Sequence, residues 1–283
     1  MERKVIQKVK GYLTKDGAGV NLVRVLGPGT IEQYDPILML DSFDSKNPDE
    51  YTAGFPMHPH RGIETISYVS SGKMMHRDSI GHSDTIEDGE VQWMTAGSGI
   101  LHEELLPASE RLLGVQLWLN LPAKDKMVPP QYHSIKKKDI EEIPFDGGFL
   151  RLLAGTYKDK SGFLGQYLPM DYYDIHLNSN SEIEIDVEEN RSILLFTLVG
   201  EVKVGDTLIE EKTAAKLSNG DKVVIRSGEE SAQVLFISSV PLKEPVAWGG
   251  PIVMNTQEEL HQAFDELRNG TFIREKDYEK MEL

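Results

Sequence analysis

Residues 63–72 have the sequence IETISYVSSG, and this run indicates the kind of fold that the chain adopts. β-branched and aromatic residues dominate it, and a glycine ends it. Similar short runs occur at residues 91–95, 112–119, 193–199 and 234–237, separated by Gly, Asp, Asn and Pro. Runs of this length between turn residues are typical of antiparallel strands in a sandwich or barrel. The sequence therefore predicts an all-β protein with a few short helices.

The two halves of the chain resemble each other in their turns. SYVSSG at residues 67–72 is followed by DGEV at 88–91, and FTLVG at 196–200 is followed by NGDKV at 219–223. In each half a strand ends in a glycine turn, and a tight Gly-acidic turn leads into a later strand. Glycine supplies the positive φ that such turns need. A duplicated barrel would explain the similarity.

A segment rich in proline and lysine separates the halves and is typical of a connection between domains. Its lysine run, Lys136–Lys138, is interpreted as a solvated face of this linker. We expect three parts along the chain: an N-terminal domain over residues 1–132, a linker over 133–146 and a C-terminal domain over 147–283.

One helix is marked near the end of the chain. Thr256 and Glu259 form a capping box, the S/T-x-x-E pattern that starts a helix. Apolar residues follow at helical spacing and a glycine is placed to end the helix: Leu260, Phe264, Leu267 and Gly270. We expect this helix to belong to the C-terminal domain.

Composition excludes several classes of function. The 283 residues carry 30 Lys and Arg against 46 Asp and Glu, a formal net charge of -16, which disfavours direct binding of nucleic acid. There is no cysteine, so disulfides, thiolate metal sites and iron–sulfur clusters are excluded. The sequence contains neither a signal-peptide pattern at its start nor an apolar stretch that could span a membrane. We expect a soluble cytoplasmic protein, with a monomer favoured.

Histidines are concentrated in the first half, where five of the 8 lie between residues 58 and 102. In a strand, residues two apart point to the same face, so His58 and His60 are predicted to converge, and Pro59 argues against a helix here. By the same rule His102 and Glu104 share a face, while Glu103 points away. The two pairs together predict a metal site with three imidazoles and one carboxylate.

This ligand set suits a divalent first-row metal. Four protein ligands leave two positions of an octahedron open, whereas zinc is satisfied by four. The set therefore favours Fe(II), with Mn, Co, Ni, Cu and Zn as alternatives. Glu64 is a further candidate, as a ligand, a base or an acceptor for a ring N–H. The remaining histidines are interpreted as structural or exposed: His76, His82, His133, His176 and His261.

Four stretches resemble one known family. They are FPMHPHRGIET at residues 55–65, GEVQWMTAGSGILHEE at 89–104, VQLWLNLP at 115–122 and GPIVMNT at 250–256. They closely resemble the pirin family within the cupin superfamily. The resemblance implies a bicupin, in which two antiparallel jelly-roll β-barrels occur in one chain and the N-terminal barrel holds one iron.

The family's three histidine ligands and one glutamate ligand fall on His58, His60, His102 and Glu104. The family's carboxylate ligand lies two residues after the third histidine, which favours Glu104 over Glu64. Residues 191–237 contain no histidine. This agrees with a C-terminal cupin that carries no metal, as the resemblance implies.

The resemblance also implies an activity, because members of this family resemble quercetin 2,3-dioxygenases. A flavonol would bind through its 3-hydroxyl, Glu104 would accept the proton as the catalytic base, and O2 would cleave the ring to a depside and carbon monoxide. The alternative is an iron-dependent regulatory protein that binds a protein partner, as eukaryotic pirins do with transcription factors. An isomerase of another cupin branch is a third hypothesis.

Several apolar residues close to the predicted ligands have two interpretations. They either line a pocket for a flat aromatic molecule or belong to the ordinary barrel core. These residues are Phe55, Met57, Trp93 and Met94. Arg61 follows the ligand His60 and is expected on the opposite side of the strand, as a surface or scaffold residue.

Overall fold

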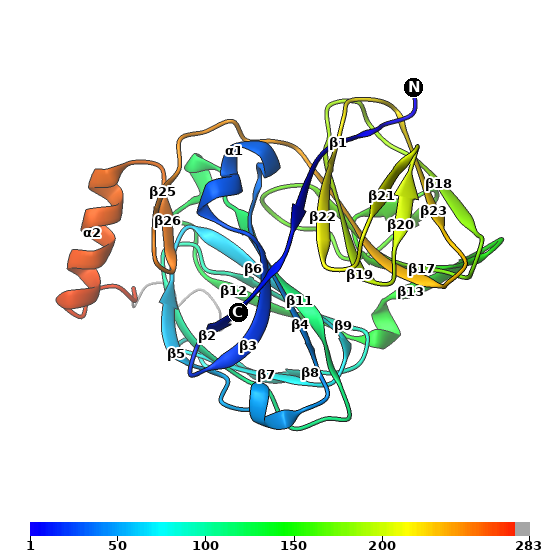
Figure 1. Ribbon diagram of the computed structural model, residues 1–283. Helices are drawn as coiled ribbons and strands as arrows, with labels where there is room; N and C mark the ends of the chain where they lie inside the picture. Colours follow the sequence, from blue (N-terminus) through cyan, green and yellow to red (C-terminus); the bar gives the residue numbers. More distant parts are fainter. Residues whose placement is uncertain (275–283) are drawn as a thin grey trace. The chain divides into compact units, whose positions relative to one another are not determined.

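The computed structural model describes residues 1–274. Contacts between residues divide the chain into two units, and Figure 1 labels most of their strands. The histidine unit, so named here for the cluster at residues 58–102, comprises Leu13–Leu22, Ile37–Lys136 and, in the described chain, residues 243–274. The second unit comprises Met1–Tyr12, Val23–Pro36 and Lys137–Leu242.

The histidine unit contains a four-stranded sheet and most of the residues of a seven-stranded one. In sheet order the larger one consists of β12 (Gln131–Ile135), β9 (Glu90–Thr95), β6 (Ile63–Ser71), β11 (Leu112–Asn120), β4 (Ile37–Ser45), β3 (Val20–Leu26) and β2 (Tyr12–Asp16). The smaller one consists of β5 (Phe55–His60), β10 (Ile100–Leu105), β7 (Met74–Asp78) and β8 (Ser83–Ile86). Strand β10 pairs antiparallel with β5 on one side and β7 on the other.

The second unit repeats this combination of sheets. Its seven-stranded sheet consists of β1 (Val5–Lys10), β22 (Thr213–Leu217), β19 (Ser192–Val199), β24 (Ala232–Ser239), β17 (Met170–Leu177), β14 (Gly148–Ala154) and β13 (Glu141–Phe145). Its four-stranded sheet consists of β18 (Glu182–Asp186), β23 (Lys222–Ser227), β20 (Val202–Val204) and β21 (Thr207–Ile209). The shared architecture is what a duplicated fold would produce.

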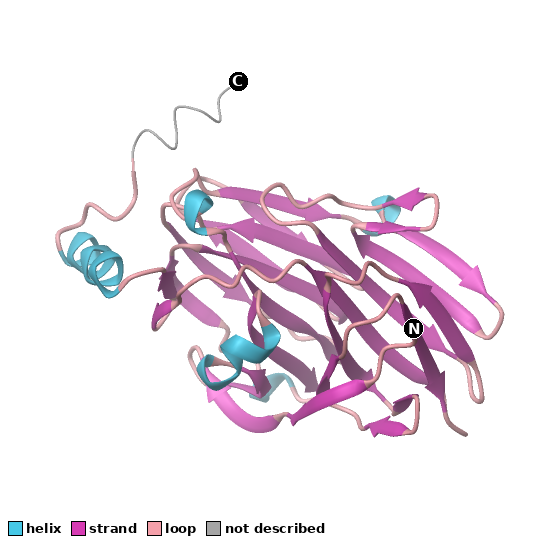
Figure 2. Ribbon diagram, turned by 90° about the horizontal axis from the view of Figure 1, so that it is seen from above, coloured by secondary structure: helices cyan, strands magenta, loops and turns pink. Residues whose placement is uncertain are grey.

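Alternation of side chains produces the core of each unit. On β18, Ile183 and Ile185 are buried while the residues between and beside them are exposed. They pack with residues of the seven-stranded sheet, such as Leu195 and Phe236, in one apolar cluster between the two sheets. In the histidine unit, Val69 of β6 and Met74 of β7 belong to a corresponding cluster. The predicted all-β fold is confirmed, and Figure 2 shows how strands dominate the described chain.

The remaining elements are short. Residues 133–146, expected as a linker, contain the end of β12 and all of β13. Two small hairpins pair β15 (Thr156–Tyr157) with β16 (Lys160–Ser161) and β25 (Ala247–Gly249) with β26 (Ile252–Met254). The short helical segments are α1 (Ile31–Tyr34) and the 3-10 turns Pro28–Thr30, Pro48–Glu50, Ala123–Asp125 and Lys137–Asp139.

The predicted C-terminal helix is confirmed as α2, Gln257–Arg268. Thr256 accepts a hydrogen bond from the backbone N–H of Glu259, whose side chain returns to the backbone of Thr256, so the capping box forms as predicted. Gly270 follows in the left-handed region, with φ of +69°. No helix in residues 1–274 is both long enough and apolar enough to cross a bilayer.

A buried lysine holds strand β26 close to the turn between β5 and β6. The Lys126 amine donates hydrogen bonds to the carbonyls of Gly62 and Val253 and to the Asn120 side chain, at 2.7, 3.0 and 2.5 Å. Gly62 must be a glycine, because its φ is +77° and an added Cβ would lie 2.0 Å from the Val253 carbonyl oxygen. Burial lowers the pKa of Lys126 to about 7, and the carboxylates of Glu244 and Glu259 offset this only in part.

We predict that Lys126 makes the stability of the protein depend on pH above neutrality. Between pH 7 and 10.5 the unfolded chain binds the proton that the folded chain has released, so stability rises with pH in this window. Urea denaturation at pH 7.5 and 9.5 should show a rise of roughly 2–3 kcal/mol in the wild type relative to Lys126→Met. Equal slopes in the two proteins would contradict the lowered pKa.

Candidate metal centre

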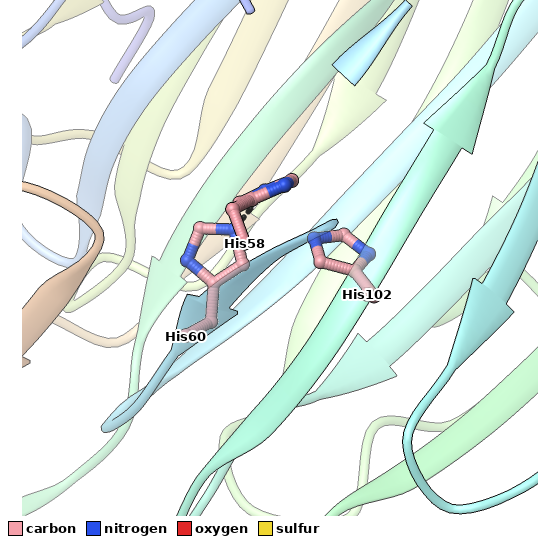
Figure 3. Close-up of side chains that lie close together, drawn as sticks. All are labelled: His58, His60 and His102. Carbon is pink, nitrogen blue, oxygen red and sulfur yellow. Dashed lines mark hydrogen bonds between the residues drawn. The ribbon is translucent and has the colours of Figure 1, made fainter. Parts of the chain in front are cut away.

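The pairing of β5 with β10 brings three histidines together. His102 lies directly opposite His58 across the ladder, and Ile100 lies opposite His60. Figure 3 shows His58 and His60 projecting from one strand towards His102 on its neighbour. Ring centroids are 4.4 Å apart for His58 and His102, and 5.0 Å apart for His60 and His102. The spacing of two residues thus places both β5 imidazoles beside the β10 imidazole, as the sequence predicts.

Hydrogen bonds determine which ring nitrogens face the cluster. A backbone carbonyl only accepts, so Nδ1–H of His58 donates to the Pro56 oxygen at 2.8 Å and Nδ1–H of His60 donates to the Pro251 oxygen at 2.9 Å. In a neutral imidazole the other nitrogen, Nε2, is then a bare acceptor. The two Nε2 atoms lie 3.1 Å apart, so two lone pairs face each other.

The electrostatics of the cluster keep the buried rings neutral. Burial lowers the pKa of His60 to about 3, with a further contribution from His58 and a small offset from the Pro251 carbonyl. Burial also holds the pKa of His102 well below its ordinary value, assisted by the neighbouring imidazoles. Neutral imidazole is the form that binds metals, so the site is prepared for a cation rather than for protons.

These residues fit a metal ion. The potential ligand atoms of His58, His60 and His102 all lie within 4.8 Å of one another. Nε2 of His102 is buried and has no hydrogen-bond partner among residues 1–274. Two nitrogens bound to one ion at about 2.1 Å would lie roughly 3 Å apart at a right angle. A cation would give all three lone pairs a partner.

Glu104 lies near this cluster but is held by other groups. Among the described residues, the set whose ligand atoms fall within 4.8 Å contains the three imidazoles and not Glu104. Gln116 Nε2 lies 2.9 Å from both carboxylate oxygens, and Gln92 Nε2 donates to Oε1 at 3.1 Å. Glu103 is partly exposed and lies 3.4 Å from Arg77, so it points away, as predicted.

The face of the seven-stranded sheet towards Glu104 carries two rows of side chains. Cross-strand pairing places Gln92, Ser67 and Gln116 in one row, whose members contact the carboxylate. The next row holds Met94, Thr65 and Trp118. The Trp118 ring packs edge-on against His60 at 5.0 Å. The polar row positions the carboxylate, and the second row supplies an apolar wall beside a candidate ligand.

No local sequence motif marks four further residues of the site: Gln92, Ser67, Gln116 and Trp118. Alternation along β11 was the available signal, since Gln116 and Trp118 lie two apart in a strand that is buried on both faces. The register with β6 and β9 was also needed, and that is set by partners distant in the sequence.

Alternation along β6 and β9 also decides which of the other predicted site residues face Glu104. Glu64 pairs with Thr95 and accepts its hydroxyl hydrogen bond at 2.6 Å, on the face of β6 opposite to Ser67. Trp93 lies on that opposite face too, opposite Ile66 on β6, while Met94 faces the Glu104 side. Burial raises the pKa of Glu64, which favours a neutral carboxylic acid there.

Phe55 is partly buried and packs 6.1 Å from Phe43, and Met57 is 51% exposed. Neither of them lies in the row that holds Met94 and Trp118. Arg61 is a scaffold residue, 2% exposed, which pairs with Glu266 at 2.7 Å and donates to the carbonyls of Ser98 and Phe272.

Three of the remaining histidines lie on or beside the sheets of the histidine unit. His76 and His82 contact Asp78 at 2.8 and 3.2 Å, and His133 is in β12. The other two lie elsewhere: His261 is exposed on α2, and His176 contacts Asp174 in the second unit at 2.8 Å.

Comparison with known proteins places the chain in a family. Its residues 19–119 match the pirin family model, and residues 172–273 match the model of the pirin C-terminal cupin domain. The chain belongs to the pirin family. A pirin-family relative from Pseudomonas aeruginosa, provisionally named a quercetin 2,3-dioxygenase, is 40% identical over 278 residues, covering 95% of this chain and 97% of the relative.

Two solved structures have the same fold. The crystal structure of a quercetin 2,3-dioxygenase from Acinetobacter baumannii matches with a TM-score of 0.89 and 34% identity, covering 96% of this chain and 99% of that one. A bacterial pirin from Escherichia coli, solved in complex with nickel(II), matches with a TM-score of 0.66 and 20% identity, covering 83% of this chain and 98% of that one.

We predict that Gln116 stabilises the protein by satisfying the buried Glu104 carboxylate. Gln116→Leu removes its hydrogen bonds and should lower the free energy of unfolding by about 1–3 kcal/mol. Urea denaturation of the metal-free protein measures this loss.

A double-mutant cycle with Glu104→Leu is the control. The cost of Gln116→Leu should be smaller once the carboxylate is gone. Strictly additive losses would show that the contact contributes nothing.

Proposed function

We propose that the protein is a metal-dependent flavonol 2,3-dioxygenase that uses Fe(II), with a flavonol and O2 as substrates. The convergence of three imidazole lone pairs at His58, His60 and His102 carries this proposal. The dioxygenase names of relatives that align over nearly the whole chain support it. A cytoplasmic location and a monomeric state stay predictions from the sequence.

Three histidines would hold the metal, and Glu104, two residues after His102 on β10, is proposed as the fourth ligand. The nickel(II) complex of a bacterial pirin supports a metal in such a site, although Fe(II) is the proposed ion for this chain. When bound, a metal supplies Lewis acidity that favours the anion of the flavonol 3-hydroxyl and brings it together with O2. The net reaction converts the flavonol and one O2 into a depside and one carbon monoxide.

The chain's own residues have separable tasks in this reaction. Glu104 accepts the proton of the 3-hydroxyl. Gln92 and Gln116 hold its carboxylate in place before the substrate arrives, because both donate amide hydrogens to it. Trp118 and Met94 provide apolar surface on the same sheet face, which suits a flat aromatic molecule and excludes water.

The proposal predicts turnover that depends on the histidine cluster. Protein loaded anaerobically with Fe(II) and mixed with quercetin and O2 should lose flavonol absorbance and release carbon monoxide in equal amounts. His102→Ala should abolish both signals and metal retention. His261→Ala is the matched control, since it removes an exposed imidazole from α2, and it should leave turnover unchanged.

The role of Glu104 has its own test. Glu104→Gln keeps the size of the side chain and removes the base, so kcat should fall by about 10²–10⁴-fold. Iron content, measured on the same sample, separates loss of the base from loss of the metal. Bound iron without any turnover of the wild type would contradict the dioxygenase proposal and would favour the iron-dependent binding of a protein partner.

A further inference from the structure

A second group of polar side chains lies beside the candidate metal centre and has no task in the proposed reaction. His76 and Asp78 lie two residues apart on β7 with fully buried side chains, and His82 follows the strand. Nδ1 of His76 lies 3.4 Å from Nδ1 of His102, and Nε2 of His76 lies 2.8 Å from Oδ2 of Asp78. These contacts connect a carboxylate to a candidate ligand through one imidazole.

The carboxylate determines the direction of every hydrogen bond in this chain of contacts. Oδ1 of Asp78 accepts the backbone N–H groups of Ile80 and His82, each at 3.0 Å. Oδ2 accepts Nε2–H of His76 at 2.8 Å and Nδ1–H of His82 at 3.2 Å. Burial raises the pKa of Asp78, but the bonds from His76 and from the His82 backbone outweigh it and lower the pKa overall. Both oxygens of Asp78 therefore act as acceptors, because four N–H groups point at them.

The tautomer of His102 follows from this arrangement. A neutral His76 that donates from Nε2 has a lone pair at Nδ1. Nδ1 of His102 faces that lone pair and must carry the hydrogen. Nε2 of His102 then has no hydrogen, and this is the buried atom without a partner in the described chain.

We propose that Asp78, acting through His76, holds His102 in the tautomer that directs the Nε2 lone pair at the metal. Asp78 and His76 are thus positioning residues. The inference rests on the proposed metal centre, but it does not depend on which substrate is turned over. Tyr132 stacks on His76 with centroids 4.3 Å apart and an interplanar angle of 18°, which keeps the connecting ring in its plane.

The group that fixes the tautomer of His102 differs in kind from the groups that fix those of His58 and His60. Backbone carbonyls of Pro56 and Pro251 fix the tautomers of His58 and His60, and no substitution of a side chain can remove those acceptors. His102 depends on side chains instead. A substitution of Asp78 should therefore lower the metal affinity of the centre, because it alters the tautomer of one of the three histidine ligands, His102.

The substitution Asp78→Asn tests this by reversing the hydrogen bonds. The backbone N–H groups of Ile80 and His82 hold an oxygen at the Oδ1 position, so the new NH2 group must face His76. His76 Nε2 then becomes an acceptor and Nδ1 carries the hydrogen, which opposes a hydrogen on Nδ1 of His102. Nitrogen-15 NMR of the histidine-labelled, metal-free protein, assigned with His102→Gln, reports which nitrogen of His102 is protonated.

The wild type should show a hydrogen on Nδ1 of His102, and Asp78→Asn should shift it towards Nε2. Affinity for Ni(II), measured by calorimetry, should fall roughly 10- to 100-fold in the variant. Asp174→Asn is the matched control, because Asp174 is also fully buried and accepts from a histidine two residues away at 2.8 Å. It should change neither the His102 signal nor the Ni(II) affinity.

Two further variants test the inference if Asp78→Asn fails to fold. Asn at position 76 can place its amide oxygen near the former Nδ1, so His76→Asn should keep an acceptor for His102 and retain most of the Ni(II) affinity. Gln reaches only the former Nε2 position and contacts Asp78 alone, so His76→Gln should bind Ni(II) more weakly. If His76 had only a structural role, the Ni(II) affinity of His76→Asn would not be expected to exceed that of His76→Gln.

The inference is overturned if the metal-free wild type carries the hydrogen of His102 on Nε2. A His76 with hydrogens on both nitrogens would cause this result, because its Nδ1–H would need an acceptor at Nδ1 of His102. It is also overturned if Asp78→Asn binds Ni(II) like the wild type. A wild type with the expected tautomer and normal Ni(II) binding but no turnover of quercetin would support this inference and contradict the proposed activity.

Discussion

Three imidazoles meet with one ring nitrogen of each in the same small region, and the candidate centre depends on this constraint. Each Nδ1 is occupied by a partner on the outer side: Pro56 for His58, Pro251 for His60, and the side chain of His76 for His102. The lone pairs of Nε2 are left facing inward, with two of them 3.1 Å apart. Lone pairs repel at this distance, so the paired strands must hold the rings together. A bound cation would remove this repulsion by accepting the lone pairs.

The two sheets of the histidine unit contribute different groups to the candidate metal centre. The four-stranded sheet supplies the imidazoles from β5 and β10, and the seven-stranded sheet supplies the amides that restrain Glu104. The contacts that fix this carboxylate come from two amides and a hydroxyl, with no arginine or lysine among them. This arrangement suits the role of proton acceptor that we propose for Glu104.

Much of this was predictable from short-range sequence patterns. The steps of two residues at His58–His60 and His102–Glu104 depend only on strand geometry, and they correctly predict that the three histidines converge. The position of Glu104 within the site is less accessible, because Gln116 follows it by 12 residues and determines where its oxygens lie. His76 resembles an ordinary structural histidine in the sequence, and only the register of β7 against β10 reveals its contact with His102. Long-range pairing, such as that of β1 with β22, leaves no local pattern at all.

The last part of the described chain is joined to the first strand of the candidate centre. Pro251 orients His60, while the carbonyl of Phe272 and the side chain of Glu266 bind Arg61, the next residue. Residues 137–242, which lie between these segments in the sequence, belong to the other unit. A gene segment that encoded the first 136 residues alone would lack the groups that set this ligand in place. Genetic recombination between the segment that encodes His60 and the segment that encodes Pro251 would therefore separate this histidine from the carbonyl that orients it.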